Sequence, residues 1–515
     1  MAPSATPPNV LLVTVDQLGA QWLEAPHATA APTPTLDRLR EQGIWFPNTV
    51  TSNPVCAPTR ATIATGMTTR QHGLLTNGYA LRPSLPTVMG ALQTAGVRTG
   101  GFGKFHFRPQ YTTAYPDYAP YGFDETAITE DQRIGEWLDW IRREHPGHAE
   151  AALATIPNDD IPVLESYGPH DEDLRPAIAA AREAIDWNTE LDAEGRPPAY
   201  TLPFPAELSQ TAWITRHARA FVKTSDRPWF AHVSYVQPHP PNCPPLHCLE
   251  AINVEAIPEP IPAAWPEDPS APDCFGSGDP GRHTHLNDPE ARTRRQYYLG
   301  DLVYLDEQIG TLFDVVDFDE TLVLFTADHG DLLYDHGFTG KAQKHYDPAI
   351  RVPLLVAGAG VKPGNVEALI QLEDLAPTIL DVVGVQPTRR TSPRADVDGL
   401  PEHFHGRSLR PYLRGECPED WRTSAYVESF NNIYSADPIH WARTIRTMRY
   451  RYTRYPNGAG EQLFELASDP TEQENLVNDP GYADVRHRLI EQLLDHLVLQ
   501  DDPLTYRDLV QYGVP

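Results

Sequence analysis

The sequence predicts an α/β fold, in which a large mixed, mainly parallel sheet is sandwiched by helices and followed by a smaller C-terminal α+β domain. Two observations lead to this prediction. Short apolar runs typical of buried strands alternate with helical patterns along most of the chain, which is the order found in parallel sheets. With 515 residues, the chain also exceeds one usual hydrophobic core, so we expect about two to three structural units.

The strands and helices of the main domain can be placed in order along the chain. The mainly apolar run at residues 9–15 predicts a buried first strand. A Thr-Pro turn begins the first predicted helix, and Gly96 closes the second, because glycine is favoured just past a helix end. Strands are expected at residues 9–15, 98–103, 229–236 and 321–326, and helices at residues 35–42, 87–95 and around 292–315.

Two stretches interrupt this alternation. Residues 109–205 are acidic and rich in Pro, Tyr and Ala, with one predicted helix at residues 134–144. Residues 240–285 are turn-rich and are expected to cover a cleft, where substrate selection often resides. The main domain is therefore assigned to residues 1–420, with insertions at about 109–205 and 240–285, and a C-terminal α+β subdomain and tail to residues 421–515, with strands at 425–428, 448–454 and 462–465 and a final helix near 482–497.

Composition limits the classes of function. The formal net charge of −29 argues against nucleic acid as a partner, because phosphate contacts need Lys and Arg. No run of about 18 or more apolar residues occurs, so no membrane span is expected. The amino terminus lacks the basic start and apolar stretch of a signal peptide, so we expect a cytoplasmic location. Five cysteines are an odd and sparse set, which argues against a disulfide framework.

Polar residues follow four of the predicted strands directly or closely. Asp16, Lys104, His239 and Asp328 all fall beyond the carboxyl ends of strands, which is where ligand groups gather in such sheets. The segments Asp16-Gln17 and Asp328-His329 carry the oxygen and nitrogen ligands that Ca²⁺, Mg²⁺ or Mn²⁺ accept. A single Asp at a strand end is more often a turn cap, but two of them indicate a shared cation site.

The run Cys56-Ala57-Pro58-Thr59-Arg60, a Cys-x-Pro-x-Arg pentapeptide, is the most informative motif of the chain. On its own it is equally compatible with a small, buried core cysteine. The motif becomes informative because four further motifs follow it along the chain. They are Gly103-Lys104-Phe105-His106, residues 326–330, residues 340–353 and residues 462–476. The last of them has Phe464 where a tyrosine is usual.

Taken together, these motifs resemble the formylglycine-dependent sulfatases of the alkaline-phosphatase superfamily, from residue 9 to about residue 480. The combination of Asp16-Gln17 with Asp328-His329 resembles the one in choline-sulfatase-like and phosphonate-monoester-hydrolase-like members. The resemblance implies an alkaline-phosphatase-like fold, a catalytic main domain and hydrolysis of a small-molecule sulfate ester. It also implies that a formylglycine-generating enzyme oxidises Cys56 to formylglycine (3-oxoalanine) during maturation.

The resemblance also implies a single divalent cation. Asp16, Gln17, Asp328 and His329 would hold it together with an oxygen of the modified Cys56. Ca²⁺ is the expected ion. Mn²⁺ and Mg²⁺ stay open as alternatives, because the amide of Gln17 replaces a carboxylate and lowers the charge of the site.

In the implied mechanism, the hydrated aldehyde at position 56 attacks sulfur and its second hydroxyl later expels sulfate. Asp328 would accept the proton of the attacking hydroxyl, and Arg60 would orient the diol with its planar fork. Lys104 and Lys341 would neutralise the sulfate oxygens, with Lys344 as a rival for Lys341.

Three further residues complete the expected site. His239 would protonate the departing alcohol oxygen, although a His-Pro pair also stiffens turns. His106 would assist collapse of the sulfated intermediate or bind sulfate. Asn77 is equally compatible with substrate contact and with an ordinary Asn-Gly turn.

Several alternatives stay open at this point. The same formylglycine site would also serve a phosphonate monoester or phosphodiester hydrolase, but those enzymes carry Tyr and Thr where Lys104 and His106 stand. A non-catalytic relative would have lost Cys56 or a metal ligand, and a phosphomutase-like enzyme would need two metals. Cys243 and Cys248 with His247 suggest a zinc fragment that Cys274 could complete, but four ligands are usual. The tail at residues 501–515 could serve contacts in a homo-oligomer.

Overall fold

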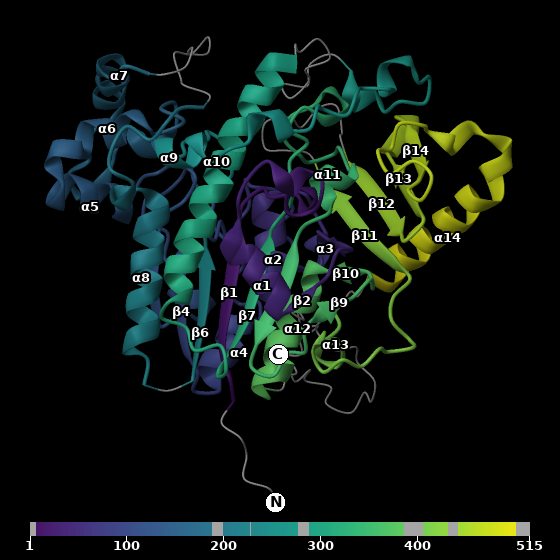
Figure 1. Cartoon of the computed structure of the whole chain (residues 1–515), viewed down its shortest axis with the longest axis horizontal. Helices are drawn as coiled ribbons and strands as arrows, with labels where there is room; N and C mark the ends of the chain where they lie inside the picture. The colour runs from purple at the N-terminus through teal and green to yellow at the C-terminus, as the bar shows by residue number, and fades with distance from the viewer. Residues whose placement is uncertain are drawn as a thin grey trace, which may run out of the picture.

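The computed structural model describes residues 7–187, 199–226, 228–276, 288–385, 405–430 and 441–500. Within these ranges, a central eight-stranded sheet carries helices on both faces, and a four-stranded sheet stands beside it (Figure 1). The tail for which we expect subunit contacts lies outside the described residues. Within the described part of the chain, no helix is both long and apolar enough to cross a membrane.

The central sheet has the order β5-β4-β6-β1-β7-β8-β2-β9. Neighbouring strands from β5 to β7 are parallel, whereas β8 runs antiparallel to both β7 and β2. The predicted mixed, mainly parallel sheet is therefore confirmed. The strands are β1 (Asn9–Val15), β2 (Ile44–Trp45), β4 (Arg98–Gly103), β5 (Glu125–Ile128), β6 (Trp229–Ser234), β7 (Thr321–Ala327), β8 (Leu354–Gly358) and β9 (Gly364–Asn365).

Helices cover the two faces of this sheet. Successive residues of a strand point to opposite faces, and in β4 Gly100 faces Phe221 of α8 whereas Gly101 faces Phe123. α8 packs on β4 and β6 and contacts α10. On β4 also lies α4, which in turn contacts α2 and α12. These helices are α1 (Pro34–Gln42), α2 (Cys56–Thr65), α4 (Val88–Thr94), α8 (Gln210–Thr224), α10 (Asp288–Phe313) and α12 (Leu375–Val383).

The acidic insertion holds more structure than its sequence indicates. One helix was predicted there, but the structure has α5 (Glu136–Glu144), α6 (Ala149–Ala154) and α7 (Arg175–Ala184). The prediction of a single helix is wrong because α6 has only six residues and α7 is rich in alanine, so neither shows a strong periodicity of large apolar residues in the sequence. The remaining short elements are α3 (Thr69–His72), α9 (Leu246–Glu250), α11 (Asp347–Ile350), α13 (Arg410–Leu413) and the two-stranded sheet of β3 (Thr49–Val50) and β10 (Ile370–Gln371).

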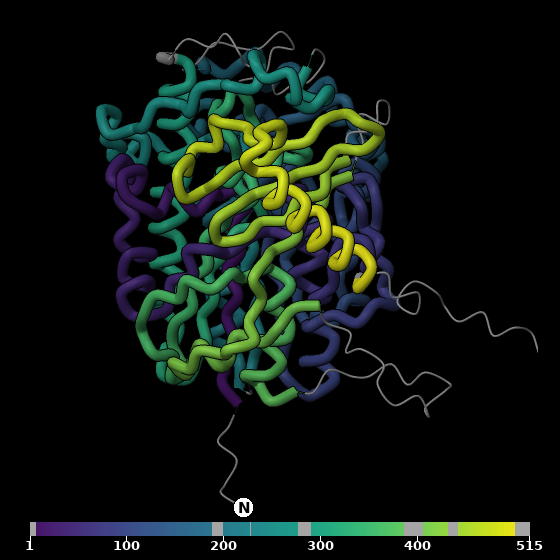
Figure 2. The backbone as a smooth tube through the Cα atoms, turned by 90° about the vertical axis from the view of Figure 1, so that its right-hand side faces the viewer, coloured from purple at the N-terminus to yellow at the C-terminus, as the bar shows by residue number. Residues whose placement is uncertain are grey.

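The predicted α+β part at the carboxyl end is confirmed as an antiparallel sheet of four strands with one long helix. Figure 2 shows this yellow-green unit facing the viewer. Buried side chains of the sheet, among them Tyr452 and Leu463, pack on Leu489 and Leu493 of the helix. The elements are β11 (Ser424–Ser429), β12 (Ala442–Thr447), β13 (Tyr450–Arg454), β14 (Glu461–Glu465) and α14 (Ala483–Gln500).

Candidate active site

Cys56 lies at the first position of α2, a helix in which every residue is buried. Its Sγ is 3.0 Å from Lys341 Nζ, 3.3 Å from His329 Nε2 and 3.8 Å from Asp16 Oδ1. Burial alone would raise the pKa of this thiol, but the positive charges of Lys104 and Lys341 with His329 hold it well below the ordinary value. The helix N-terminus adds a further preference for negative charge. Position 56 is thus built for an anionic or electron-rich group.

Four side chains from three separate segments of the chain place metal-type donor atoms around one point. Asp16, Cys56, Asp328 and His329 each contribute one donor atom, and these atoms lie within 4.8 Å of one another. All four residues are buried. His329 Nδ1 donates to the carbonyl of Gly330 at 3.0 Å, so Nε2 is the ring nitrogen that faces the cluster. This second hydrogen bond is how proteins orient histidine ligands, and the donor set suits a divalent cation.

Gln17 lies beside this cluster but has other partners in the structure. Its backbone N–H donates to Asp328 Oδ1 at 3.0 Å, and its Oε1 accepts from Lys341 Nζ at 2.5 Å. Its Nε2 donates to Asp331, which also accepts from the N–H groups of Leu333 and Gly340 at 2.8 Å each. Gln17 has a φ of 70°, a region that non-glycine residues rarely occupy. Asp331 was not predicted, although it stands three residues after Asp328.

Arg60 connects the two carboxylates of the cluster. Its Nε donates to Asp328 Oδ2 at 2.8 Å, and its Nη2 is 3.3 Å from Asp16 Oδ2. Its Nη1 donates to Ser234 Oγ at 2.6 Å and to the carbonyl of Lys104 at 2.7 Å. Burial works against ionisation of Asp328, but Arg60 and His329 outweigh it, so the pKa of this carboxyl is lowered. Arg60 thus turns the second oxygen of each carboxylate towards Cys56, and its role in orienting a diol stays a prediction.

Lys104 enters the site from the end of β4. The preceding residue, Gly103, has a φ of 102°, and a Cβ there would lie 1.9 Å from the carbonyl oxygen of Ser234. Only glycine fits such a position. The Lys104 ammonium pairs with Asp16 and, at 2.5 Å, with Asp131. Burial opposes the charge, but Asp131 and Asp16 raise the pKa of this lysine, which therefore stays a cation.

His106 is held by residues that the sequence analysis did not identify. Gln110 Nε2 donates to His106 Nδ1 and to Asp131 Oδ2, both at 2.9 Å. Since Nδ1 accepts, the proton of the neutral ring is on Nε2. Glu130 Oε1 accepts from the backbone N–H of His106 at 3.0 Å. Glu130 and Asp131 belong to the acidic insertion, where no motif distinguishes them from other surface acids.

His239 lies half-buried at the edge of the cluster. Its Nδ1 donates to the carbonyl of Pro240 at 2.7 Å. A ring nitrogen of His239 lies within 4.8 Å of carboxylate oxygens of Asp16 and Asp131. Burial and Lys341 lower the pKa of this imidazole, but the two carboxylates outweigh them, and the pKa is raised above 6.5. His239 therefore keeps an imidazolium available near neutral pH.

Two remaining predicted residues differ in their proximity to Cys56. Asn77 Oδ1 accepts from the N–H of Ala57 at 3.1 Å and so holds the start of α2. Substrate contact by Asn77 stays a prediction. Lys344, the rival of Lys341, lies with its Nζ 4.8 Å from the ring centroid of Phe338, whereas Lys341 contacts Cys56 directly.

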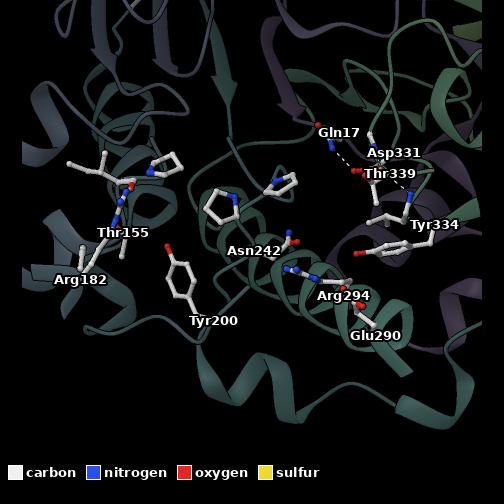
Figure 3. A pocket seen from close by; sticks show the side chains of 17 residues that line it. Gln17, Thr155, Arg182, Tyr200, Asn242, Glu290, Arg294, Asp331, Tyr334 and Thr339 are labelled. Atoms are coloured by element: carbon white, nitrogen blue, oxygen red, sulfur yellow. Dashed lines mark hydrogen bonds between the residues drawn. The ribbon is translucent and has the colours of Figure 1, made fainter. Parts of the chain in front are cut away.

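A cavity of about 510 Å³ opens next to Gln17. Figure 3 shows Gln17, Asp331 and Thr339 at one end, Arg182 and Tyr200 at the other, and Asn242 and Arg294 between them. Pro240 and Gly340 also line the cavity, and these residues are the chain neighbours of His239 and Lys341. The cavity is bounded by parts of both predicted insertions, as expected for a substrate-selecting wall.

The geometry can now be compared with known proteins. The family model for sulfatases matches residues 8–385, and a model for the C-terminal part of N-sulphoglucosamine sulphohydrolase matches residues 334–498. This chain belongs to the sulfatase family. It is 29% identical to the multifunctional alkaline phosphatase superfamily protein PehA of Trinickia caryophylli, over 92% of each chain. It is 27% identical to a choline-sulfatase of Rhizobium meliloti, over 92% of this chain and 83% of the relative.

A solved structure agrees with this assignment. The phosphonate monoester hydrolase SpPMH from Silicibacter pomeroyi matches with a TM-score of 0.74 and 26% identity, over 96% of both chains. The predicted family and its choline-sulfatase-like and phosphonate-monoester-hydrolase-like relatives are therefore confirmed, and this sulfatase-family member is a hydrolase of the alkaline-phosphatase superfamily.

Proposed function

We propose that the chain hydrolyses a small-molecule sulfate monoester with formylglycine, formed from Cys56, as the nucleophile. The observation that carries this proposal is the position of Cys56 between metal-type donors on one side and lysine ammonium groups on the other. Lys341 Nζ is 3.0 Å from its Sγ, and His329 Nε2 is 3.3 Å away. When Cys56 is oxidised and hydrated, it supplies two hydroxyls on one carbon, of which one attacks sulfur and the other permits release of sulfate.

A divalent cation fits the donor set of Asp16, Asp328, His329 and the side chain at position 56. Ca²⁺ is our first expectation, and Mn²⁺ or Mg²⁺ would accept the same oxygen-rich ligands. The amide oxygen of Gln17 would join if Lys341 turned from it towards substrate. When bound, the cation would supply positive charge next to the nucleophile and the ester oxygens.

The charges of the described site explain how an acidic protein would accept an anion. Three carboxylates, Asp16, Asp131 and Asp328, face three cations, Arg60, Lys104 and Lys341. These six charges balance, and the His239 imidazolium adds a further positive charge, so a divalent cation would leave the site positive although the whole chain carries −29. A local positive cleft of this kind attracts an anionic ester. Lys104 and Lys341 would then contact the sulfate oxygens.

His239 is the group placed to protonate the leaving alcohol. Its Nδ1–H donates a hydrogen bond to the carbonyl of Pro240, so Nε2–H is the donor of the imidazolium that is left for substrate. The neighbouring cavity next to Gln17 would hold the alcohol part of the ester. Asp328 would take the proton of the attacking hydroxyl. Because Arg60 lowers the pKa of Asp328, we expect it to hold this proton only transiently.

A second function within the same fold is hydrolysis of phosphonate monoesters or phosphodiesters. The observation in its favour is the solved phosphonate monoester hydrolase at a TM-score of 0.74. Against it stands Lys104, whose ammonium reaches into the centre of the site beside Asp16. A second cation at that position favours a sulfate monoester with three peripheral oxygens, and some activity on the other esters is expected from similar charge.

The test combines maturation with a substrate panel. The full chain is produced with and without a formylglycine-generating enzyme, and intact mass reports conversion of Cys56. Choline sulfate, an aryl sulfate, a sugar sulfate and a phosphonate monoester are then compared by kcat/KM. We expect turnover only in converted protein, with a sulfate ester preferred. A higher kcat/KM for the phosphonate ester would support the second function instead.

A further inference from the structure

Outside the candidate active site, metal-type donors also meet where α9 packs on α10. His247 and Cys248 belong to α9 and Glu307 to α10, and Figure 1 shows the two helices side by side. His247 Nε2 is 3.1 Å from Glu307 Oε2 and 3.2 Å from Cys248 Sγ. Cys248 Sγ is 3.7 Å from the same Glu307 oxygen. One nitrogen, one sulfur and one oxygen thus form a triangle with sides of 3.1, 3.2 and 3.7 Å.

The size of this triangle matches tetrahedral zinc. With zinc bonds of about 2.0–2.1 Å to nitrogen and oxygen and about 2.3 Å to sulfur, ideal angles require about 3.3 Å between N and O and about 3.6 Å between S and either. The observed N–O separation of 3.1 Å and S–O separation of 3.7 Å lie close to these values, and the S–N separation of 3.2 Å is shorter by about 0.4 Å. A small rotation of the exposed His247 side chain would bring all three atoms to zinc-bond distance of one ion.

The exposure of the three side chains also fits such a site. The Cys248 side chain is buried, whereas His247 is 59% and Glu307 45% exposed. The sulfur would therefore be shielded, while solvent would reach the ion and supply a fourth ligand. An ion pair between His247 and Glu307 would not by itself bring the Cys248 sulfur within 3.2 Å of the imidazole nitrogen and 3.7 Å of the carboxylate oxygen.

The sequence suggested a different zinc set, and the structure corrects it. Cys243 Sγ accepts a hydrogen bond from Arg133 at 3.2 Å, and Cys274 packs in a separate core cluster with Phe275. Neither cysteine joins Cys248. The third donor, Glu307, lies 59 residues away from Cys248 on another helix, so no local motif could have indicated it.

We propose that His247, Cys248 and Glu307 bind one Zn²⁺, with water as the fourth ligand. Binding releases the thiol proton of Cys248 to solvent and forms bonds between zinc and sulfur, nitrogen and oxygen. The ion links the turn-rich segment that carries α9 to α10. One turn and a half earlier on α10, Asp301 accepts from Asn242 Nδ2 at 3.0 Å, and Asn242 lines the cavity. Zinc would thereby stabilise one wall of that cavity.

Cobalt is the probe for this site, because a thiolate bound to Co²⁺ gives a near-ultraviolet charge-transfer band. The titration uses the full chain with Cys56→Ala, so that the candidate active site has no thiol to contribute. We expect the band to reach a plateau that corresponds to one Co²⁺ per Cys248 and to disappear when Zn²⁺ is added, whereas Co²⁺ held by Asp16, Asp328 and His329 adds no thiolate band. Cys248→Ser should abolish the band, and the exposed variant Glu307→Gln should weaken Co²⁺ binding at least about 10-fold. Cys417→Ser, at an exposed cysteine, is the matched control and should leave the band unchanged.

Thermal unfolding provides a second readout that does not depend on absorbance or activity. Zn²⁺ should raise the midpoint in the Cys56→Ala protein by more than in the same protein with Cys248→Ser, because a ligand stabilises only the state that binds it. Absence of the charge-transfer band, or a band that persists in Cys248→Ser, would overturn the proposal. If Cys248→Ser does not fold, unchanged Co²⁺ affinity in Glu307→Gln would overturn it as well.

Discussion

Beneath the C-terminal sheet, both oxygens of one buried carboxylate are matched by a single arginine, whereas at the carboxyl edge of the large sheet the buried carboxylates share a common centre. In the first region, Arg446 Nε and Nη2 donate to the two oxygens of Asp347 at 2.9 and 2.8 Å. In the second, Asp16 and Asp328 each give only one oxygen to Arg60, and the other faces Cys56 and His329. When one arginine takes both oxygens, the carboxylate holds the fold together. Asp328 Oδ1 accepts backbone N–H groups but also lies at a common point with the donor atoms of Asp16, Cys56 and His329, where a cation could bind.

The strongest test is Cys56→Ala in the shared region. We expect kcat for an aryl sulfate to fall on the order of 10⁴-fold or more, since removal of a nucleophile leaves only residual catalysis. The midpoint of thermal unfolding should change little, because alanine keeps the helix and removes one sulfur. Steady-state kinetics and calorimetry on the same preparation measure both. Undiminished turnover would show that Cys56 is only a core residue.

The second largest loss of activity is expected when the ammonium group of Lys104 or Lys341 is removed. Lys104→Met and Lys341→Met should each lower kcat/KM for a sulfate ester about 10²- to 10³-fold, as loss of one oxyanion-stabilising donor does. Lys344→Met is the matched control, since its ammonium lies on the Phe338 ring rather than against Cys56. Equal losses in all three variants would mean that the lysines act through folding rather than on substrate.

His239 should matter most for poor leaving groups. His239→Asn is expected to reduce kcat for an alkyl sulfate about 10²-fold, with a much smaller effect on a nitrophenyl sulfate whose leaving group needs no proton. The pKa of His239 is raised above 6.5, so the acid is present at lower pH and the rate falls as pH rises through that raised pKa. The variant should lack this decline. An identical pH profile in both proteins would assign the proton to another group.

Beneath the C-terminal sheet, Arg446→Met should lower the free energy of unfolding without changing the catalytic rate. Removing one partner of a buried pair costs about 3 kcal/mol, measured by urea unfolding, while kcat per folded molecule stays unchanged. Burial opposes ionisation of Asp347, but Arg446 lowers its pKa from 3.8 to about 2. The stabilisation is therefore present above pH 3.8 and is lost as pH falls towards 2. Arg143→Met, at an exposed pair with Glu144, is the control and should leave the unfolding midpoint unchanged.

Most of the shared region could be predicted because the carboxyl ends of parallel strands meet. Asp16, Lys104 and Asp328 follow three such strands, and the motif at Cys56 and Arg60 supplied the rest. The structure brings these five residues together.

Other parts could not be predicted, for physical reasons. Glu130 and Asp131 lie in an irregular acidic stretch, where nothing in the local pattern separates a buried acid from an exposed one. Strand β8 is antiparallel to β7, and a short apolar run does not reveal its direction. Glu307 contacts His247 of another helix, so its partners depend on helix packing rather than on spacing.

Turnover measured as a function of the aldehyde content at position 56 decides whether formylglycine is the nucleophile. Preparations with graded conversion of Cys56 are obtained by varying the maturation enzyme, and intact mass gives the converted fraction in each. We predict that kcat for a sulfate ester rises in proportion to that fraction and extrapolates to zero in unconverted protein. Full turnover in protein whose Cys56 is still a thiol would contradict the account.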